Sequence, residues 1–137
     1  MSEEKKIQVV AALIIRHHRI LICQRPANKA RGLLWEFPGG KVEPGETQGA
    51  ALARECREEL DIELAAESVY AAVVHRYPDI LVELTLWRAR ILSGVPKALE
   101  HPNIRWVNPD EMGEYPFCPA DTNLIKQIMK DHREGML

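Results

Sequence analysis

The chain has 137 residues, with 18 basic and 20 acidic side chains and a formal net charge of -2. This length predicts a single domain over residues 1–137, and 46% hydrophobic and 28% charged residues are typical of a globular protein, not of a disordered chain or a coiled coil. The slightly acidic balance gives no support for binding to a nucleic-acid polymer or to an anionic membrane.

The first half of the chain predicts a hairpin and a short strand. Residues 7–15 and 20–24 are rich in Val, Ile and Leu and flank a polar turn. A polar and basic loop is expected over residues 26–32. A short strand over residues 33–37 should end at the Pro38-Gly39-Gly40 stretch.

A helix is expected from Thr47, a suitable N-cap, to about Leu60. Leu52, Cys56 and Leu60 recur every four residues and predict its buried face, which makes Cys56 a core residue. Further strands are predicted over residues 69–75, 80–90 and 104–107, and a last helix after Pro119. Strands and two helices without a strict alternation predict an α+β fold or an α/β/α sandwich.

Three widely spaced cysteines, Cys23, Cys56 and Cys118, fit neither a disulfide framework nor a zinc site. Reduced thiols are typical of the cytoplasm, which is the expected location. The longest apolar stretch, residues 7–15, contains Gln8 and is too short to span a bilayer. The sequence gives no indication of the oligomeric state.

The segment 40–62 reads GKVEPGETQGAALARECREELDI and joins a glycine-rich bend to an acidic helix. Helix positions three and four apart share a face, so Glu55, Glu58 and Glu59 converge. Such like-charged pairs destabilise a helix by roughly 0.2–0.5 kcal/mol each, and Arg54 offsets only part of this charge. A divalent cation would neutralise it, and oxygen ligands favour Mg²⁺, Mn²⁺ or Ca²⁺ over zinc. The alternative interpretation is a solvated acidic helix face.

This segment resembles the box of the Nudix hydrolase family, GX5EX7REUXEEXGU, where U is a bulky aliphatic residue. The matching positions are Gly40, Glu46, Arg54, Glu55, Glu58, Glu59 and Ile62. Cys56 stands at an aliphatic position, and Asp61 replaces the usual glycine, although Asp tolerates the left-handed geometry that ends a helix. The stretches CQRP and WEFPGGKVE, the strand at 104–107 and the run 119–121 resemble MutT-type nucleoside triphosphate pyrophosphohydrolases, so the likeness covers nearly the whole chain.

The resemblance implies an α/β/α sandwich around a mixed sheet, in which the box forms loop–helix–loop. It also implies Mg²⁺-dependent hydrolysis, with Mn²⁺ as the alternative metal, of a nucleoside triphosphate to the monophosphate and pyrophosphate. The implied metal ligands are the Gly39 carbonyl and the carboxylates of Glu55, Glu58, Glu59 and Glu100. Glu55 is the first candidate for the general base and Glu100 the second, while Arg54 would position the glutamates. For Glu100, the alternative is an exposed loop acid.

The candidates for substrate binding are Arg25, Glu36, Phe37, Gly40, Lys41 and Asp121. Phe37 would stack on the base or belong to the core. An ionised Asp121 accepts two hydrogen bonds side by side, which suits guanine and favours 8-oxo-dGTP and the clearing of damaged nucleotides. Asp121 is also placed to cap the last helix.

Three alternatives to 8-oxo-dGTP hydrolysis stay open. The first is the same reaction on CTP, dCTP or a modified pyrimidine nucleotide, because relatives acting on pyrimidines carry the same Pro-Ala-Asp run. The second is a nucleoside diphosphate linked to a sugar, a nucleoside or a second nucleotide. The third is a nucleotide-binding module without catalysis, in which box carboxylates would be expected to be lost, whereas here all are present.

Overall fold

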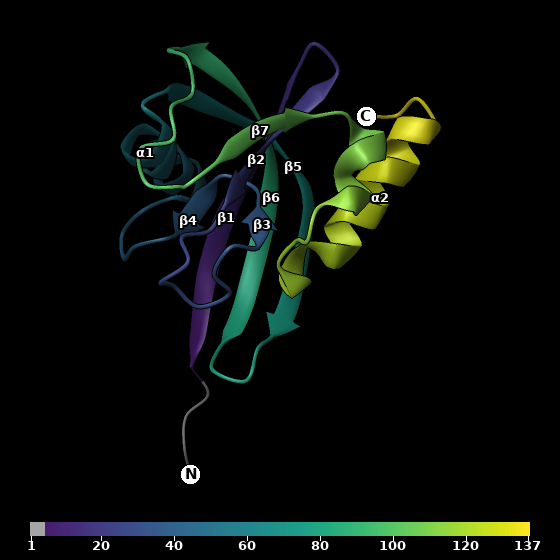
Figure 1. The fold of residues 1–137 in the computed structure, drawn as a ribbon. Helices are drawn as coiled ribbons and strands as arrows, with labels where there is room; N and C mark the ends of the chain where they lie inside the picture. Colours follow the sequence, from purple (N-terminus) through teal and green to yellow (C-terminus); the bar gives the residue numbers. More distant parts are fainter. Residues whose placement is uncertain (1–4) are drawn as a thin grey trace.

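A mixed sheet runs through the centre of the structure, a computed structural model that describes residues 5–137 (Figure 1). The first four residues of the expected 1–137 domain lie outside the described part. The strands are β1 (Lys6–Arg16), β2 (Arg19–Gln24), β3 (Trp35–Glu36), β4 (Gly39–Lys41), β5 (Glu63–Arg76), β6 (Leu81–Ser93) and β7 (Ile104–Val107). The helices are α1 (Gln48–Leu60) and α2 (Thr122–Arg133), with short 3₁₀ segments η1 (Pro109–Glu114) and η2 (Pro119–Asp121).

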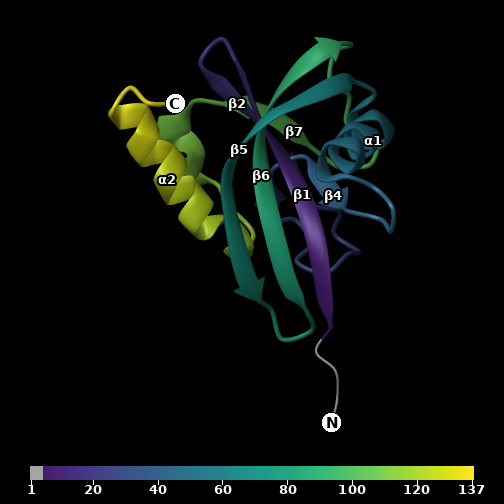
Figure 2. The ribbon, with the colours of Figure 1, turned by 180° about the vertical axis from the view of Figure 1, so that it is seen from behind.

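Strand β1 is the centre of this sheet. It pairs in parallel with β6 and antiparallel with β2 and β4, and the strand order is β3-β2-β1-β6-β5. Its side chains alternate between two cores: Ala11 and Leu13 pack on the side of α2, and Val10 and Ala12 on the side of α1. The two helices lie on opposite sides of the sheet (Figures 1 and 2), which confirms the predicted α/β/α sandwich.

Helix α1 begins and ends as its sequence predicts. The Thr47 hydroxyl accepts a hydrogen bond from the Ala50 amide at 3.1 Å, and Asp61 adopts the left-handed conformation with φ 56° and ψ 43°. The Asp61 amide donates to the Arg57 carbonyl at 3.1 Å. Cys56 is fully buried, which confirms that it belongs to the core.

Three strands differ from the sequence-based expectation, and one of them, β3, covers only Trp35–Glu36 and not residues 33–37. Strand β5 begins at Glu63 and not at residue 69, because register shifts between 63 and 71 interrupt the alternation from which strands are recognised. The Gly39-Gly40 stretch does not only end a strand: it forms β4, in which Gly40 is paired with Val10. Within residues 5–137 there is no helix of the length and apolar character that crossing a membrane requires.

Candidate active site

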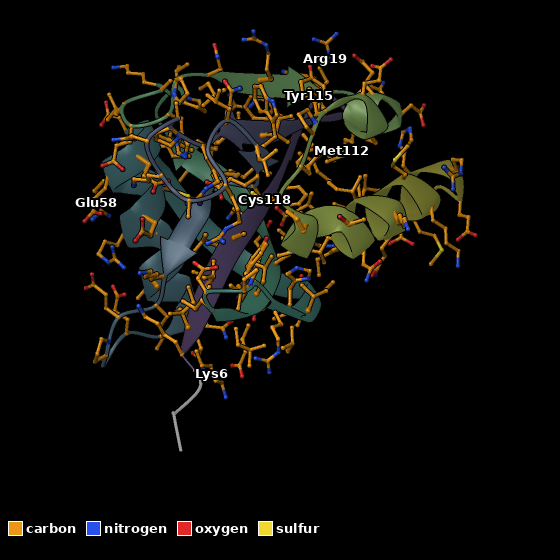
Figure 3. All side chains as sticks on the ribbon, turned by 60° about the horizontal axis from the view of Figure 1, so that its bottom comes forward. Lys6, Arg19, Glu58, Met112, Tyr115 and Cys118 are labelled. Atoms are coloured by element: carbon orange, nitrogen blue, oxygen red, sulfur yellow. The ribbon has the colours of Figure 1, made fainter. Side chains whose placement is uncertain are left out.

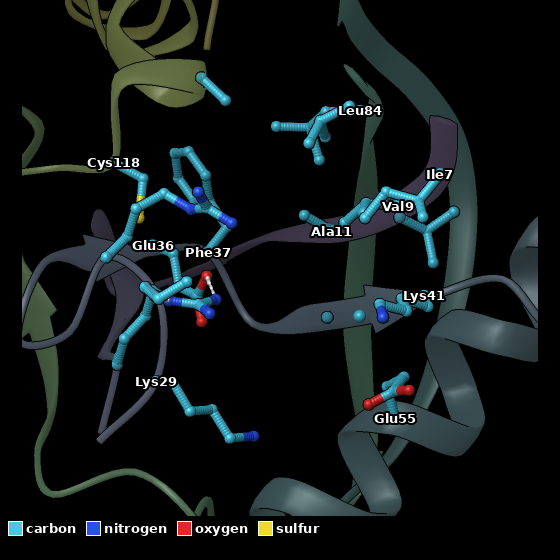
Figure 4. Close-up of a pocket in the computed structure, with 18 of the residues that line it drawn as sticks. Ile7, Val9, Ala11, Lys29, Glu36, Phe37, Lys41, Glu55, Leu84 and Cys118 are labelled. Atoms are coloured by element: carbon cyan, nitrogen blue, oxygen red, sulfur yellow. Dashed lines mark hydrogen bonds and ion pairs between the residues drawn. The ribbon is translucent and has the colours of Figure 1, made fainter. Parts of the chain in front are cut away.

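A cleft of about 620 Å³ opens beside the apolar wall formed by β1 and β6 (Figure 4). Most of the predicted site residues line it: Arg25, Glu36, Phe37, Gly39, Gly40, Lys41, Glu55, Glu59, Glu100 and Asp121. Glu55 projects from α1 below β4, whereas Glu36, Phe37 and Cys118 lie at the opposite end of the view. The fold thus brings together segments from four separate parts of the chain, with the Glu55 carboxylate of α1 at one end and Glu36 with an aromatic ring at the other.

Two glycines allow β4 to lie flush against its neighbours. Gly39 has φ 154°, and a Cβ atom there would lie 2.0 Å from the Val10 carbonyl oxygen. A Cβ atom on Gly40 would lie 2.4 Å from the carboxyl carbon of Glu55. The backbone of β4 therefore occupies the space directly beside the Glu55 carboxylate, which only glycine permits.

Arg54 joins the loop before α1 to the helix itself. Its Nε lies 2.7 Å from Glu46 Oε2 and its Nη2 2.9 Å from Glu46 Oε1, while Nη1 lies 2.9 Å from Glu55 Oε1. Nη2 also donates to the Lys41 carbonyl at 3.1 Å. The hydrogen bonds from Arg54 lower the pKa of Glu46 to about 2. Arg54 does not line the cleft, and its contacts are those of a residue that positions Glu55.

Glu59 lies at the base of the cleft with one oxygen unsatisfied. Its Oε2 is buried and has no hydrogen-bond partner. Burial first, and then the neighbouring Glu55 carboxylate, raise the pKa of Glu59 well above its ordinary value. A cation at this point would supply positive charge that offsets the repulsion between the two adjacent carboxylates.

The donor set fits a hard divalent cation, because the candidate ligands are all oxygen atoms and one of them is buried without a partner. Over residues 5–137, no three His, Cys, Asp or Glu side chains are already grouped closely enough to hold an ion. Glu58 is the candidate that lies apart: its side chain is 55% exposed, sits on the outer side of α1 (Figure 3) and contacts Arg54 Nη1 at 3.4 Å. Glu55, Glu59 and Glu100 line the cleft instead, and Glu100 is at the same time an exposed loop acid, as its alternative interpretation expects.

The opposite end of the cleft carries the candidates for base and phosphate recognition. Arg25 Nη1 lies 3.0 Å from Glu36 Oε1. Phe37 is only 3% exposed and packs within the core on the side of α2, yet it also lines the cleft. Asp121 is 4% exposed and occupies the expected N-cap position of α2, but its side chain makes no capping hydrogen bond to the helix. Burial and then Glu36 raise the pKa of Asp121, and Arg25 opposes them in part.

The structure adds residues that the sequence did not indicate. His101 is buried, and its Nε2 lies 3.8 Å from both Glu36 Oε2 and Glu59 Oε2. Its only sequence signal is that it follows Glu100. Tyr77 also lines the cleft, although its Tyr-Pro-Asp context indicates no more than a turn.

Comparison with known proteins gives a consistent picture. A family model described as "NUDIX domain" matches residues 10–127. The CTP pyrophosphohydrolase of Escherichia coli is 42% identical over 125 residues, covering 91% of this chain and 93% of that protein. A putative 8-oxo-dGTP diphosphatase 2 of Mycobacterium tuberculosis is 37% identical, covering 89% and 87%. Among solved structures, the E. coli ORF135 protein has a TM-score of 0.81 at 40% identity, covering 96% of this chain and 94% of that chain.

Proposed function

The chain belongs to the Nudix family and is a hydrolase of nucleotide anhydrides, and from this premise we propose that it releases pyrophosphate from a cytosine nucleoside triphosphate. The observation that makes a cytosine base compatible with the site is the buried Asp121 at one end of the cleft. The 42% identity to a CTP pyrophosphohydrolase over most of both chains supports the same substrate.

Cytosine is compatible with Asp121 when that carboxyl group is neutral. The preference for guanine assumes an ionised carboxylate, which would repel the N3 acceptor of cytosine. Burial raises the pKa of Asp121 and favours the neutral acid. A neutral carboxyl group has one donor beside one acceptor, so it can donate to cytosine N3 while accepting from the 4-amino group.

The second candidate substrate is 8-oxo-dGTP. A neutral carboxyl group can also pair with the N1–H and O6 edge of guanine. The 37% identical relative from M. tuberculosis is named as a putative 8-oxo-dGTP diphosphatase. Both candidates give the same products, a nucleoside monophosphate and pyrophosphate, and they differ only in the base.

The acidic end of the cleft would hold Mg²⁺, with Mn²⁺ as the alternative. The ligands we assign are the Gly39 carbonyl and the carboxylates of Glu55, Glu58, Glu59 and Glu100, of which Glu58 has the least support because it faces solvent. When bound, the ion supplies positive charge that offsets the charge of the phosphates.

The residues of the chain itself divide into two tasks. Glu55 accepts the proton of the attacking water, with Glu100 as the alternative base, and Arg54 holds Glu55 in place through its 2.9 Å contact. Arg25 and Lys41 present positive charge to the cleft, where they attract the triphosphate. The same proposal includes one domain over residues 1–137 that acts in the cytoplasm on free nucleotides, and not on nucleic-acid polymers or membranes.

The test is a substrate panel with Mg²⁺: CTP, dCTP, 5-substituted dCTP, UTP, dGTP, 8-oxo-dGTP and ADP-ribose. We expect the highest kcat/KM for a cytosine nucleotide, with CMP or dCMP and pyrophosphate as products. A higher kcat/KM for 8-oxo-dGTP would replace cytosine by the second candidate. Absence of turnover for every compound would contradict the proposed reaction and favour a binding module.

A further inference from the structure

Tyr77 connects the end of β5 to the Ala120 backbone and to the loop that carries Arg31. It lies just after β5, is 8% exposed and lines the cleft. Its hydroxyl group contacts the backbone next to Asp121, and its ring contacts a loop from another part of the sheet.

The hydroxyl group of Tyr77 fixes the backbone from which Asp121 projects. The Ala120 amide donates a buried hydrogen bond of 2.9 Å to Tyr77 Oη. Two backbone bonds also hold this segment, since the Cys118 amide donates to the Trp35 carbonyl at 2.9 Å and the Asp121 amide to the Cys118 carbonyl at 2.9 Å. Loss of the Tyr77 hydroxyl would therefore leave the Ala120 amide buried without a partner, one residue before Asp121.

The ring of Tyr77 connects the loop between β2 and β3 to the turn between β5 and β6. The Arg31 guanidinium carbon lies 4.0 Å from the ring centroid, a cation–π contact. Arg31 Nη1 also lies 3.2 Å from Asp79 Oδ1 in the turn that follows Tyr77. Arg31 itself has φ 58°, a conformation that a non-glycine residue adopts when its surroundings hold it there. Arg31, Tyr77 and Asp79 all line the cleft.

Base selection needs such a device, because Asp121 alone cannot supply it. A neutral carboxyl group can carry its proton on either oxygen, so it pairs with the amino edge of cytosine and with the carbonyl edge of uracil or guanine. Both pairings use the same two oxygen atoms, so discrimination depends on where the backbone holds the carboxyl group relative to the bound base, which a displaced backbone would change.

We propose that Tyr77 is a positioning residue for base selectivity, which orients Asp121 through the Ala120 amide and holds the Arg31 loop over the base. This inference rests on the proposed function, because it takes Asp121 as the group that reads the base. Arg31 has a different effect, because its contacts with Tyr77 and Asp79 confine any bound nucleotide, whatever its base.

The chain contains a matched control for both residues. Tyr70 donates its hydroxyl hydrogen to Asp131 Oδ2 and carries Arg88 over its ring at 4.9 Å, but neither Tyr70 nor Arg88 lines the cleft. Tyr77→Phe and Tyr70→Phe each remove one hydroxyl and keep the ring. Arg31→Ala and Arg88→Ala each remove one stacked guanidinium group.

We expect Tyr77→Phe to lower the ratio of kcat/KM for CTP over UTP at least fivefold, mainly through a higher KM for CTP, with kcat retained. Tyr70→Phe should leave the ratio as in the wild type, even if both variants melt at lower temperature. Arg31→Ala should raise KM for CTP and UTP alike by at least fivefold, and Arg88→Ala should not. An unchanged ratio in Tyr77→Phe, or an equal change in Tyr70→Phe, would overturn the proposal.

Binding of the products separates this inference from the proposed reaction. The affinities for CMP and UMP are measured by ¹⁵N-detected titration of the wild type and the four variants, which requires no turnover. If the wild type hydrolyses no triphosphate, the proposed function fails, yet loss of CMP-over-UMP preference in Tyr77→Phe alone would still support the role of Tyr77. Absence of any preference in the wild type would overturn it.

Discussion

Arg54 and Glu46 form a two-point ion pair at the start of α1, with Nε 2.7 Å from Oε2 and Nη2 2.9 Å from Oε1. The planar guanidinium group has further donors in fixed directions, and these contact Glu55 and the Lys41 carbonyl. The Arg54 side chain therefore sets the positions of the loop before α1, of β4 and of Glu55, the candidate general base.

Arg54→Lys should lower kcat on the order of 100-fold, because an ammonium group cannot satisfy all of these acceptors at once and misplaced catalytic groups cost about that much. KM should change little, since Arg54 does not line the cleft. Steady-state kinetics with CTP measure both. Arg57→Lys, an exposed change in the last turn of the same helix, is the control. Activity of Arg54→Lys within threefold of the wild type would contradict the positioning role.

Two glycines of the box, Gly40 in β4 and Gly49 in the first turn of α1, offer a matched pair of alanine variants. Gly40→Ala would place Cβ 2.4 Å from the Glu55 carboxyl carbon, so we expect Glu55 to move and kcat to fall on the order of 100-fold. Gly49 lies within α1, and Gly49→Ala places the new Cβ atom at an ordinary contact distance of 3.7 Å from Ala66 Cβ in β5. It should raise the free energy of unfolding in urea by about 0.5–1 kcal/mol without changing kcat. Equal kcat for the two variants would show that the space beside Glu55 has no catalytic importance.

Glu59 provides the test for the metal. With Mg²⁺ at about 100 times its dissociation constant, the wild type should gain about 2.7 kcal/mol of stability over the protein in EDTA. Glu59→Gln should lose most of this gain and lower kcat/KM by more than about 100-fold, about 3 kcal/mol. Thermal melts with and without Mg²⁺ measure the stabilisation, and steady-state kinetics measure kcat/KM. Glu63→Gln is the exposed control for both. A full Mg²⁺ gain in Glu59→Gln would remove Glu59 from the ligand set.

Structural features that depend on residues close together in the sequence could be predicted from the sequence alone. The Thr47 cap, the buried face through Cys56 and the left-handed Asp61 all depend on local spacing and backbone preference. The candidate carboxylates of α1 are found for the same reason, because helix periodicity places Glu55 and Glu59 on one face.

Features that depend on contacts between distant segments could not be predicted in this way. The bond from the Ala120 amide to Tyr77 joins residues 43 positions apart, and His101 lies near Glu36 and Glu59 only because the loop after β6 returns to the sheet. The neutral state favoured for Asp121 also results from burial, which a sequence with one aspartate after Pro-Ala does not reveal. For this reason the sequence alone favoured guanine.

The protonation of Asp121 predicts a specific dependence of stability on pH. Because burial raises its pKa in the folded protein, the folded state binds more protons than the unfolded state above about pH 4, so this carboxyl group lowers stability as pH rises towards its folded pKa. Asp121→Asn cannot ionise and lacks this loss. The difference in free energy of unfolding, variant minus wild type, should therefore increase from pH 4.5 to 8, by at most about 1.4 kcal/mol per pH unit.

Urea unfolding at four pH values measures this difference, with Asp61→Asn as the control, because the Asp61 side chain is 58% exposed and its ion-pair partner is Lys97, not a histidine. The control should run parallel to the wild type. Parallel curves for Asp121→Asn as well would mean that Asp121 is ionised in the folded protein. The repulsion between a carboxylate and cytosine N3 would then apply, and the two N–H donors of guanine would make 8-oxo-dGTP the better substrate.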